Sequence, residues 1–544
     1  MIRSIGQLIK VDFRDFFRSS KKYMLSKLSS RLSRGFSGKV SLSVANAPAQ
    51  QVFQTIPFKK EDPADVLASV PDVNYYVFPE ATPYPFREVP MHEPVATPLL
   101  HSTPHSTRGE FSFSKLENGL RVASIDKQGL TAEISLVVNA GPRFECVEEL
   151  GVSDFVKQVA FTSTAHLSHL RTVKTIEALG ATASCSVTRE HIIYHIECLR
   201  EYMPIAVTLL TGNILFPRLL EWEVNLARSK FEKDRESFKP DKDAMLDDLV
   251  HATAYHNNSL GRRLTASDSN NFTPEAIRTF MLKNFSMENS MCSSVNVSHE
   301  ELTLWLSRAF ADYTPIPHSV RPIVRPQYTG GYLIQESSET YGNLYVAAAF
   351  EMGGWDSADV VAGTVLQTLL GGGGSYSTGG PGKGMHSRLY LQVLNSKYFV
   401  DNCQAFSSIH SDSGLFGINI SGQGKDAGKL IGCLVEQLGK LDSFTKEEIK
   451  RAKNLLKGNL FSANDNAKAV CEDAAKQILM GGRYLSPIDF VAQIDAVSEA
   501  DIISLAKKLL NTPITLVLYG DTAQAPHLTQ VQKLLDAAKK GWKI

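Results

Sequence analysis

The residues best suited to metal chemistry in this chain are two pairs of histidines. His191 and His195 are four residues apart in REHIIYHIE, and His166 and His169 are three apart. The β-branched residues between His191 and His195 favour a strand, where these side chains would lie roughly 13 Å apart and could not share an ion. No Cys or acidic residue stands at ligand spacing beside the other pair. Ordinary core or surface histidines are therefore the favoured interpretation of both pairs.

The cysteines offer no metal site by their spacing. They are odd in number and form no C-x-x-C pair, which indicates a reducing compartment and argues against a zinc ribbon. The seven are Cys146, Cys185, Cys198, Cys292, Cys403, Cys433 and Cys471.

A glycine-rich segment, GGGGSYSTGGPGKGMHSRLY at 371–390, has eight glycines within fourteen residues. We expect no regular element there, but a loop whose free N–H and C=O groups could receive an extended peptide. A nucleotide loop is excluded by spacing, because Lys383 is followed by Gly384 and the first glycine of that motif would fall at Ser377. A role as a plain surface loop stays open. The candidate substrate-binding residues are Gly371, Gly372, Gly373, Gly374, Ser375, Tyr376, Gly379, Gly380, Pro381, Gly382, Lys383 and Gly384.

Two segments must position this loop. Apolar residues at helical spacing between Ser357 and Leu370 predict a helix that ends at Gly371. The same spacing through Leu389 and Val393 predicts a second helix over 385–394. The loop would therefore be anchored at both ends.

Composition bounds the class of protein. The chain has 544 residues, 43% of them hydrophobic and 21% charged, which is enough for two or more domains with full cores. With 57 basic and 57 acidic residues, the overall charge gives no support for nucleic-acid binding. No uncharged apolar run approaches the roughly 18 residues that a membrane span needs.

The N-terminal segment is strongly basic. Residues 1–40 hold ten Lys or Arg residues against only Asp12 and Asp15, with apolar and basic residues on opposite faces of a helical wheel. This pattern is typical of a mitochondrial transit peptide, and an amphipathic helix lying on a membrane or a partner has the same wheel. Arg34-Gly35-Phe36-Ser37 resembles the Arg-x-Phe/Tyr-Ser signal at which presequences are cut, so we expect cleavage between Phe36 and Ser37.

A proline-rich arm follows the leader. Residues 41–110 hold eleven of the 24 prolines, so we expect an extended arm, and a disordered leader remains the alternative.

Regular patterns begin at Phe111 and then recur. A hairpin is predicted around Asn118-Gly119. Strands are expected at 135–139, 181–187, 191–199 and 290–297, and helices at 147–160, 167–179 and from Thr273. The strand at Ser135 is echoed at Tyr345, and the capped helix at Thr273 is echoed at Ser498. Two copies of one α+β domain are therefore predicted, joined by a proline-rich linker.

Three stretches carry a family resemblance: NGLRVAS, HATAYHNNSLGR at 251–262, and the glycine-rich segment. Over about 111–540 the chain resembles the pitrilysin-type metallopeptidase superfamily, and in particular the alpha subunits of mitochondrial processing peptidases. The resemblance implies two homologous domains, each a mostly antiparallel sheet packed with helices, facing each other across a cavity. The expected organisation is a transit peptide at 1–36, the arm at 37–110, an N-terminal domain at 111–314, a linker at 315–331 and a C-terminal domain at 332–544.

Active members of this superfamily carry H-x-x-E-H on a helix, with a distal Glu as third ligand. In the matching helix here, Asp154 and Gln158 stand at the histidine positions, Lys157 at the catalytic Glu and Asp234 at the distal acid. An ammonium cannot act as a general base beside zinc, and an amide is a poor ligand for it. We therefore expect no metal and no catalytic residue on this chain, with Lys157 paired to Asp154 or Asp234.

The resemblance implies a non-catalytic subunit that binds presequences in the mitochondrial matrix for a zinc-containing beta partner. The alternative is a structural core subunit of respiratory complex III at the inner membrane, alone or in addition. A rearranged active peptidase is disfavoured. Acids such as Glu336, Glu339 and Glu351 are not distinguished as ligands of presequence arginines.

Overall fold

The structure is a computed structural model that describes residues 109–238, 241–265, 272–311, 324–375, 385–441 and 443–540. The expected cleavage position at Phe36 and Ser37 and almost all of the proline-rich arm lie outside the described residues. So do residues 376–384 of the glycine-rich segment and most of the expected linker. Below, the first half means residues 109–311 and the second half means residues 324–540.

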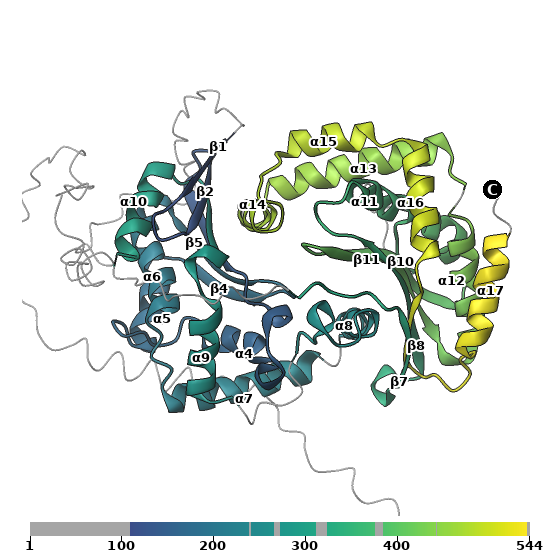
Figure 1. Cartoon of the computed structure of the whole chain (residues 1–544), viewed down its shortest axis with the longest axis horizontal. Helices are drawn as coiled ribbons and strands as arrows, with labels where there is room; N and C mark the ends of the chain where they lie inside the picture. Colours follow the sequence, from purple (N-terminus) through teal and green to yellow (C-terminus); the bar gives the residue numbers. More distant parts are fainter. Residues whose placement is uncertain are drawn as a thin grey trace, which may run out of the picture. The chain divides into compact units, whose positions relative to one another are not determined.

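Each half contains a six-stranded mixed sheet (Figure 1). The first sheet consists of β1 (Glu110–Lys115), β2 (Arg121–Asp126), β3 (Thr131–Val138), β4 (Thr182–Val187), β5 (Ile192–Leu199) and β6 (Ser290–Val295), in the order β1-β2-β6-β3-β5-β4. The second consists of β7 (Gly331–Glu336), β8 (Asn343–Gly353), β9 (Gly372–Gly374), β10 (Val400–Ile409), β11 (Ser413–Gln423) and β12 (Thr515–Gly520), in the order β7-β12-β8-β11-β10-β9.

Five strands repeat with the same order and orientation in both sheets. β2 pairs parallel with β6, as β7 does with β12, and the three following pairings are antiparallel in each sheet. The predicted correspondence of the strands at Ser135 and Tyr345 is therefore confirmed, because they belong to β3 and β8 at matching positions. The α+β fold built from two related copies is confirmed as well.

Helices follow the same repeated plan. The first half contains α4 (Val152–Val159), α5 (His169–Ala178), α6 (Met203–Leu215), α7 (Glu221–Phe238), α8 (Lys242–Ala254), α9 (Pro274–Asn284) and α10 (His299–Ala309). The second contains α11 (Asp359–Leu370), α12 (Ala427–Gly439), α13 (Lys446–Asn464), α14 (Ala467–Gly481), α15 (Pro487–Ala496), α16 (Glu499–Asn511) and α17 (Leu528–Lys540). The caps expected at Thr273 and Ser498 are present, since both side chains accept a backbone N–H of the first turn.

Local sequence explains several element ends. Gly119 in the β1–β2 turn has φ +93, and the Asn118 side chain accepts the N–H of Leu120. Gly180 after α5 has φ +59, and Gly180 and Ala181 donate back to Glu177 and Ile176. This is the glycine-terminated helix end expected from the sequence.

Each half lends one helix to the sheet of the other half. Leu246, Leu249 and Val250 of α8 share a buried cluster with Ala347 and Val517 of the second sheet. In the opposite direction, α14 buries its apolar face on β3 and β6 of the first sheet, through the cluster Ala123, Val137, Ile193, Met291, Ala475 and Ile478. The other face of the second sheet packs on helices of its own half, including α12 and α17, which lie side by side (Figure 1). The exchange makes the two cores mutually dependent.

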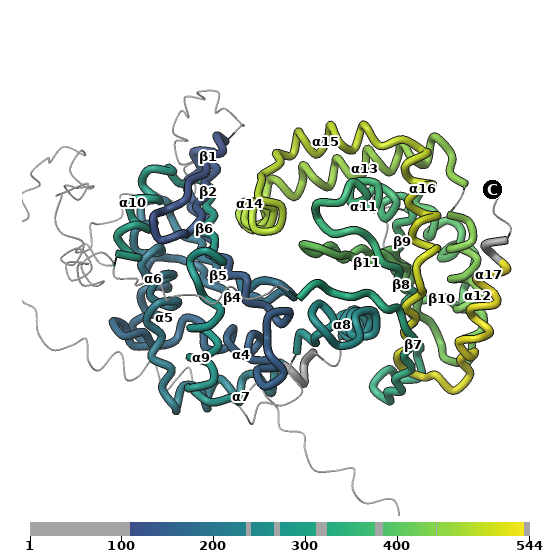
Figure 2. Tube along the Cα trace, in the orientation of Figure 1, coloured from purple at the N-terminus to yellow at the C-terminus, as the bar shows by residue number. Residues whose placement is uncertain are grey.

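Three expectations about local structure are wrong in part. The helix predicted over 147–160 is divided into a short 3-10 turn, η2 (Val147–Glu149), and α4, because Gly151 between them has φ +86. The helix predicted over 385–394 closes as a five-residue π-helix, η7 (Tyr390–Leu394). Gly372–Gly374 form strand β9, whereas the glycine-rich segment was expected to form no regular element; the trace in Figure 2 passes from α11 into it.

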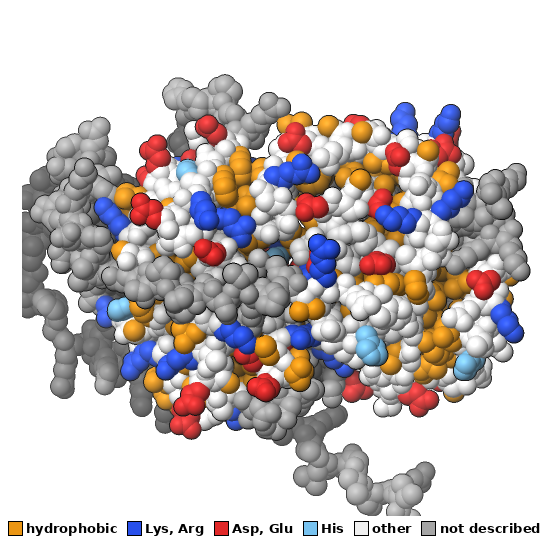
Figure 3. Space-filling model, in the orientation of Figure 1, with side chains coloured by type: hydrophobic (Ala, Val, Ile, Leu, Met, Phe, Trp, Pro, Cys, Tyr) orange, Lys and Arg blue, Asp and Glu red, His pale blue; other side chains and the backbone are white. Residues whose placement is uncertain are grey.

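The surface carries both charge signs. Basic and acidic side chains are interspersed over the face shown in Figure 3, in keeping with the zero net charge of the chain. Of the helices in the described part of the chain, none has the length and apolar character needed to cross a membrane.

Candidate functional site

Helix α4 begins above a buried carboxylate. Glu145 accepts hydrogen bonds from the backbone N–H groups of Gly151 and Ser153, at 2.7 and 2.8 Å, and from the Ser153 hydroxyl. These bonds satisfy donors that the first turn of a helix leaves free. Burial raises the pKa of Glu145 to about 7, although the hydrogen bonds from Ser153 and Gly151 act to lower it. Helix α4, which carries the candidate positions Asp154, Lys157 and Gln158, is thus fixed at its start.

Lys157, which the resemblance aligns with the general base, forms an ion pair. Lys157 Nζ lies 2.7 Å from Asp154 Oδ1, one turn back on α4, which confirms one of the two pairings expected for Lys157. Asp154 is buried, and its burial raises its pKa, while Lys157 acts in the opposite direction. The ammonium therefore compensates a buried carboxylate and has no proton acceptor to offer a water molecule.

Gln158 is held by the distal acid. Its side-chain Nε2 donates to Asp234 Oδ2 on α7, and its Oε1 is buried and has no hydrogen-bond partner among the described residues. The structure thus brings all four substituted positions together: Asp154, Lys157, Gln158 and Asp234. It joins them as two pairs, Lys157 with Asp154 and Gln158 with Asp234.

These four residues do not fit a zinc ion. Zinc in proteins is bound by imidazole, thiolate or carboxylate groups. Here the Asp154 carboxylate faces an ammonium, and the amide nitrogen of Gln158, which cannot ligate zinc, is directed at Asp234. Within the described residues, no group of three or more His, Cys, Asp or Glu side chains is placed to hold a metal ion.

The histidine pairs weighed from the sequence have other partners. His195 lies on β5, and its Nδ1 is 2.8 Å from Ser135 Oγ and its Nε2 2.8 Å from Glu133 Oε2. His191 Nδ1 is 2.6 Å from Asn139 Oδ1. The strand interpretation of this segment is confirmed. His166 packs against the Phe216 ring, and His169 Nδ1 is 3.3 Å from Phe161 O.

The glycine-rich segment begins as an edge strand. Gly372, Gly373 and Gly374 of β9 pair antiparallel with Gln404, Cys403 and Asn402 of β10. β9 is the last strand of its sheet in the strand order. The N–H of Gly372 donates to the hydroxyl of Ser387, which lies beyond residues 376–384. The two ends of the segment are therefore tied together.

Its glycines serve different purposes. At Gly372, φ is +106, and an added Cβ would lie 2.0 Å from the carbonyl oxygen of Cys403. At Gly371 it would lie 2.4 Å from Cβ of Ser387. At Gly373 and Gly374 no described atom lies within 4 Å of an added Cβ. The first two glycines are required by backbone packing, and the next two leave backbone open to an approaching chain.

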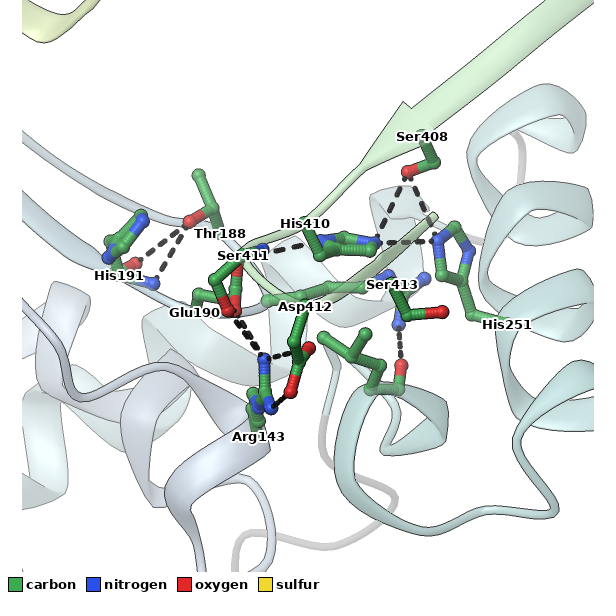
Figure 4. Close-up of polar contacts among 12 residues, drawn as sticks. Arg143, Thr188, Glu190, His191, His251, Ser408, His410, Ser411, Asp412 and Ser413 are labelled. Carbon is green, nitrogen blue, oxygen red and sulfur yellow. Dashed lines mark hydrogen bonds and ion pairs between the residues drawn. The ribbon is translucent and has the colours of Figure 1, made fainter. Parts of the chain in front are cut away.

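A buried polar junction joins the halves, and Figure 4 shows it. Arg143, in the 3-10 turn η1 (Pro142–Phe144), contacts Glu190 Oε1 at 2.5 Å and Asp412 Oδ2 at 2.5 Å. Glu190 also accepts the backbone N–H of Ser411 at 3.0 Å. Burial acts to raise the pKa of Glu190, but the hydrogen bonds from Ser411 and the charge of Arg143 outweigh it, so this pKa lies below its ordinary value. These contacts fix the β10–β11 turn of the second half to the first half.

Two buried histidines complete the junction (Figure 4). His251 Nε2 lies 3.2 Å from His410 Nε2, and His251 Nδ1 lies 2.8 Å from the carbonyl oxygen of Asp247. A carbonyl only accepts, so His251 carries its proton on Nδ1 and His410 donates from Nε2. Burial lowers the pKa of both, that of His410 to about 3. Both rings are therefore neutral at neutral pH.

No pattern in the sequence pointed to this junction. Arg143 lies in a 3-10 turn, and Glu190 and Asp412 lie in the β4–β5 and β10–β11 connections. None of the three belongs to a motif. His251 does stand in HATAYHNNSLGR, one of the stretches that carried the resemblance, but its partner His410 is 159 residues away.

Comparison with known families accounts for both halves. Residues 121–268 match the family described as Insulinase (Peptidase family M16), and residues 271–456 match the family described as Peptidase M16 inactive domain. The first match contains Asp154, Lys157, Gln158 and Asp234, and the second contains the glycine strand.

Individual relatives match over most of the chain. The "Mitochondrial-processing peptidase subunit alpha" of Solanum tuberosum is 33% identical, over 76% of this chain and 82% of the relative. The proteins of the same name from Bos taurus and Homo sapiens are 27% and 26% identical, each over 85% of this chain and 92% of the relative.

Proposed function

Because the chain belongs to the M16 peptidase family and is similar to mitochondrial-processing peptidase alpha subunits over most of its length, we propose that it is the non-catalytic, presequence-recognising subunit of a mitochondrial processing peptidase. Its partner is a beta subunit that holds the zinc and cleaves the bound precursor. The heterodimer acts in the mitochondrial matrix. The basic leader of this chain is itself a presequence, removed after Phe36.

The observation that carries the non-catalytic role is the ion pair on α4. Lys157 occupies the position of the general base and is bonded to Asp154 at the position of a zinc ligand. A dication at this site would repel the ammonium and would have to displace it from a buried carboxylate. Removing the Lys157 charge alone would still leave Gln158, whose amide faces Asp234. Catalysis therefore belongs to the partner.

Substrate recognition is assigned to the glycine-rich segment, residues 371–384. Presequences differ in sequence, so a subunit that binds many of them gains from contacts with the main chain, which every peptide shares. Gly373 and Gly374 offer backbone without side chains at an edge strand. The close packing of Gly371 and Gly372 holds the start of the segment in place. Adaptable backbone on a fixed base suits a variable, extended ligand.

The test compares cleavage of a presequence peptide by the mature chain alone, by the chain with its beta partner, and by that pair with residues 376–384 replaced by a two-residue link. Metal content is measured for each. We expect the chain alone to be inert and free of stoichiometric zinc, the pair to cleave, and the shortened pair to bind the peptide at least tenfold more weakly.

Each other result points elsewhere. Stoichiometric zinc and cleavage by the chain alone would refute the non-catalytic role. A shortened pair with full peptide affinity would remove the role of the segment. Cofractionation of this chain with cytochromes in the inner membrane, without loss of cleavage on its depletion, would favour the alternative of a structural core subunit of respiratory complex III.

A further inference from the structure

Four uncharged polar side chains lie together beside the glycine strand. They are Asn402 and Gln404 on β10 and Asn419 and Ser421 on β11, named here the amide floor. Asn402 pairs across the strands with Ser421, and Gln404 pairs with Asn419. Cross-strand partners share one face of a sheet, and the residues that alternate with them, such as Cys403 and Ile420, lie in the core on the other face. The amide floor therefore occupies one continuous surface of the second sheet.

The position of this surface is defined by α8 and β9. Helix α8 packs on the same face of the sheet, but over β7, β12 and β8, where Ala347, Ala349 and Val517 meet it. The amide floor begins on the next strand, β11, and ends on β10 at the pairing of Asn402 with Gly374. It thus leads from the exchanged helix to the open glycines of β9.

Two hydrogen-bond acceptors of the floor have no partner in the part of the chain that the structure describes. The Oδ1 atoms of Asn402 and Asn419 are both buried and have no hydrogen-bond partner among the described residues. Buried polar atoms are rarely left in this condition, because they lose hydration without compensation. Two such acceptors at diagonal positions of neighbouring strands suit a ligand that brings several N–H donors at once.

Carboxylates on this side of the sheet lie outside the floor. Glu351 faces the same side and pairs with Leu415, four residues along β11 from Asn419, or about 13 Å away. Asp243 of α8 acts on Tyr345, the β8 partner of Ser421. Asp401 is next to Asn402 at the bulge of β10, where its side chain is exposed and its carbonyl accepts the N–H of Ser375. The four side chains of the amide floor carry no charge, so they can recognise a ligand by hydrogen-bond geometry and not by opposite charge.

Resting on the proposed function, we propose that the amide floor is a subsite for an arginine side chain of the presequence, whose guanidinium donates N–H groups to Asn402 and Asn419 while the peptide passes along β9. Arginine is suited to it because a guanidinium presents five N–H donors in one plane, whereas a lysine presents three at a single point. Presequences supply such residues; the leader of this chain has ten Lys or Arg within its first 40 residues.

The test separates hydrogen bonding from charge. A presequence peptide with a methylated, uncleavable scissile bond is prepared in a series in which one arginine at a time is kept, replaced by citrulline, or replaced by norleucine. Citrulline is neutral but keeps most of the N–H donors, and norleucine keeps none. Binding is measured to the wild-type heterodimer, to a heterodimer that carries both Asn402→Leu and Asn419→Leu, and to a heterodimer that carries Asp401→Asn. Gln335→Leu on β7, at the other edge of the same sheet, is the matched control.

At one arginine position of the presequence, we expect the citrulline peptide to bind the wild-type heterodimer with an affinity within threefold of that of the arginine peptide. The norleucine peptide should bind at least tenfold more weakly. The double Leu variant removes the difference between citrulline and norleucine, and Gln335→Leu and Asp401→Asn retain it. If the double Leu variant unfolds at a lower temperature than the wild type, the measurement is repeated with a heterodimer that carries Asn402→Ala and Asn419→Ala.

Two outcomes overturn the subsite. In one, citrulline is as weak as norleucine at every arginine, so that charge and not donor geometry is recognised. In the other, the double variants discriminate as the wild type does. Failure of the proposed function looks different, since the wild-type heterodimer would then bind no member of the series more tightly than the beta partner does alone.

Discussion

The two halves share five strands in one order, but the sixth strand is added at opposite ends of that order. In the first sheet β1 covers the edge of β2, and β4 ends the sheet. In the second sheet no strand of the described residues covers β7, and β9 is added beside β10. The two copies have therefore kept one core and changed its borders. The change at β10 is what brings glycine backbone to the edge of a sheet.

Helix α4 of the first half and helix α11 of the second half also differ. α4 carries a buried polar group, Asp154, paired with Lys157, and Gln158 beyond it. α11 is apolar at its buried positions, including Val365, Leu366 and Leu369, and runs directly into the glycine strand. The first half thus has a buried ion pair at the positions where the family resemblance predicted a substituted metal site, while the second half presents glycine backbone.

The largest expected effect comes from separating the halves at Arg143. Arg143→Met leaves Glu190 and Asp412 without their guanidinium, and breaking such a buried pair costs about 3–5 kcal/mol. Chemical denaturation should show this loss. Arg200→Met, which breaks a partly exposed pair with Asp126, is the matched control and should change stability by no more than about 1 kcal/mol. Equal effects of the two substitutions would show that the junction does not couple the halves.

Acid should act on the same junction through His410. Its pKa is lowered to about 3, mainly by burial and then by His251, with Arg189 and Arg143 acting in the same direction and Glu190 against them. Because the folded-state pKa of His410 lies below the ordinary value near 6.5, the neutral ring costs no folding stability above about pH 6.5. As pH falls below 6.5, the unfolded state binds the proton while the folded state does not, so the loss of stability grows. Wild-type stability should therefore fall by about 3 kcal/mol more than that of His410→Gln between pH 7 and pH 4.

The measurement is the difference in unfolding free energy between wild type and His410→Gln at each pH. His527→Gln, at an exposed histidine, is the control and should follow the wild type. A His410→Gln curve that runs parallel to the wild type would contradict a neutral, buried His410.

The two kinds of glycine in β9 can be compared directly. Gly372→Ala forces a Cβ against the Cys403 carbonyl at φ +106 and should cost about 1–3 kcal/mol, with weaker presequence binding. Gly374→Ala enters open space and should change stability by less than about 0.5 kcal/mol. Thermal unfolding and peptide affinity of the heterodimer are the readouts. If Gly374→Ala destabilises as much as Gly372→Ala, the division between packed and open glycines is wrong.

The smallest effect is expected on α4. Lys157→Met removes the ion pair from buried Asp154 and should cost about 1 kcal/mol, since Lys157 is itself partly exposed. The pKa of Asp154, already raised by burial, should rise further, so the loss should be greater at pH 8 than at pH 4. Lys174→Met on the exposed side of α5 is the control. A loss that does not vary with pH would mean that Asp154 is not the partner that matters.

How much of this molecule was predictable depends on the range of the interactions. The Asn118-Gly119 hairpin, the end of α5 at Gly180 and the cap at Thr273 are settled within a few residues by turn and cap chemistry. The recurrence of such local patterns predicted the repeated fold. The substituted positions on α4 followed from a family resemblance. If the fold is kept, both Asp154 and Asp234 come within reach of Lys157, so a pairing with one of them was expected, and the structure has the one with Asp154.

Tertiary structure alone decided the rest. β9 exists because Gly372–Gly374 find partners on β10, and no property of three glycines predicts a strand. Likewise, the neutral His251–His410 pair joins residues 159 positions apart, and the exchange of α8 and α14 depends on which sheet each apolar face reaches. Hydrophobic periodicity in the sequence determines that a face is buried, but the surface that buries it is chosen only when distant segments pack together.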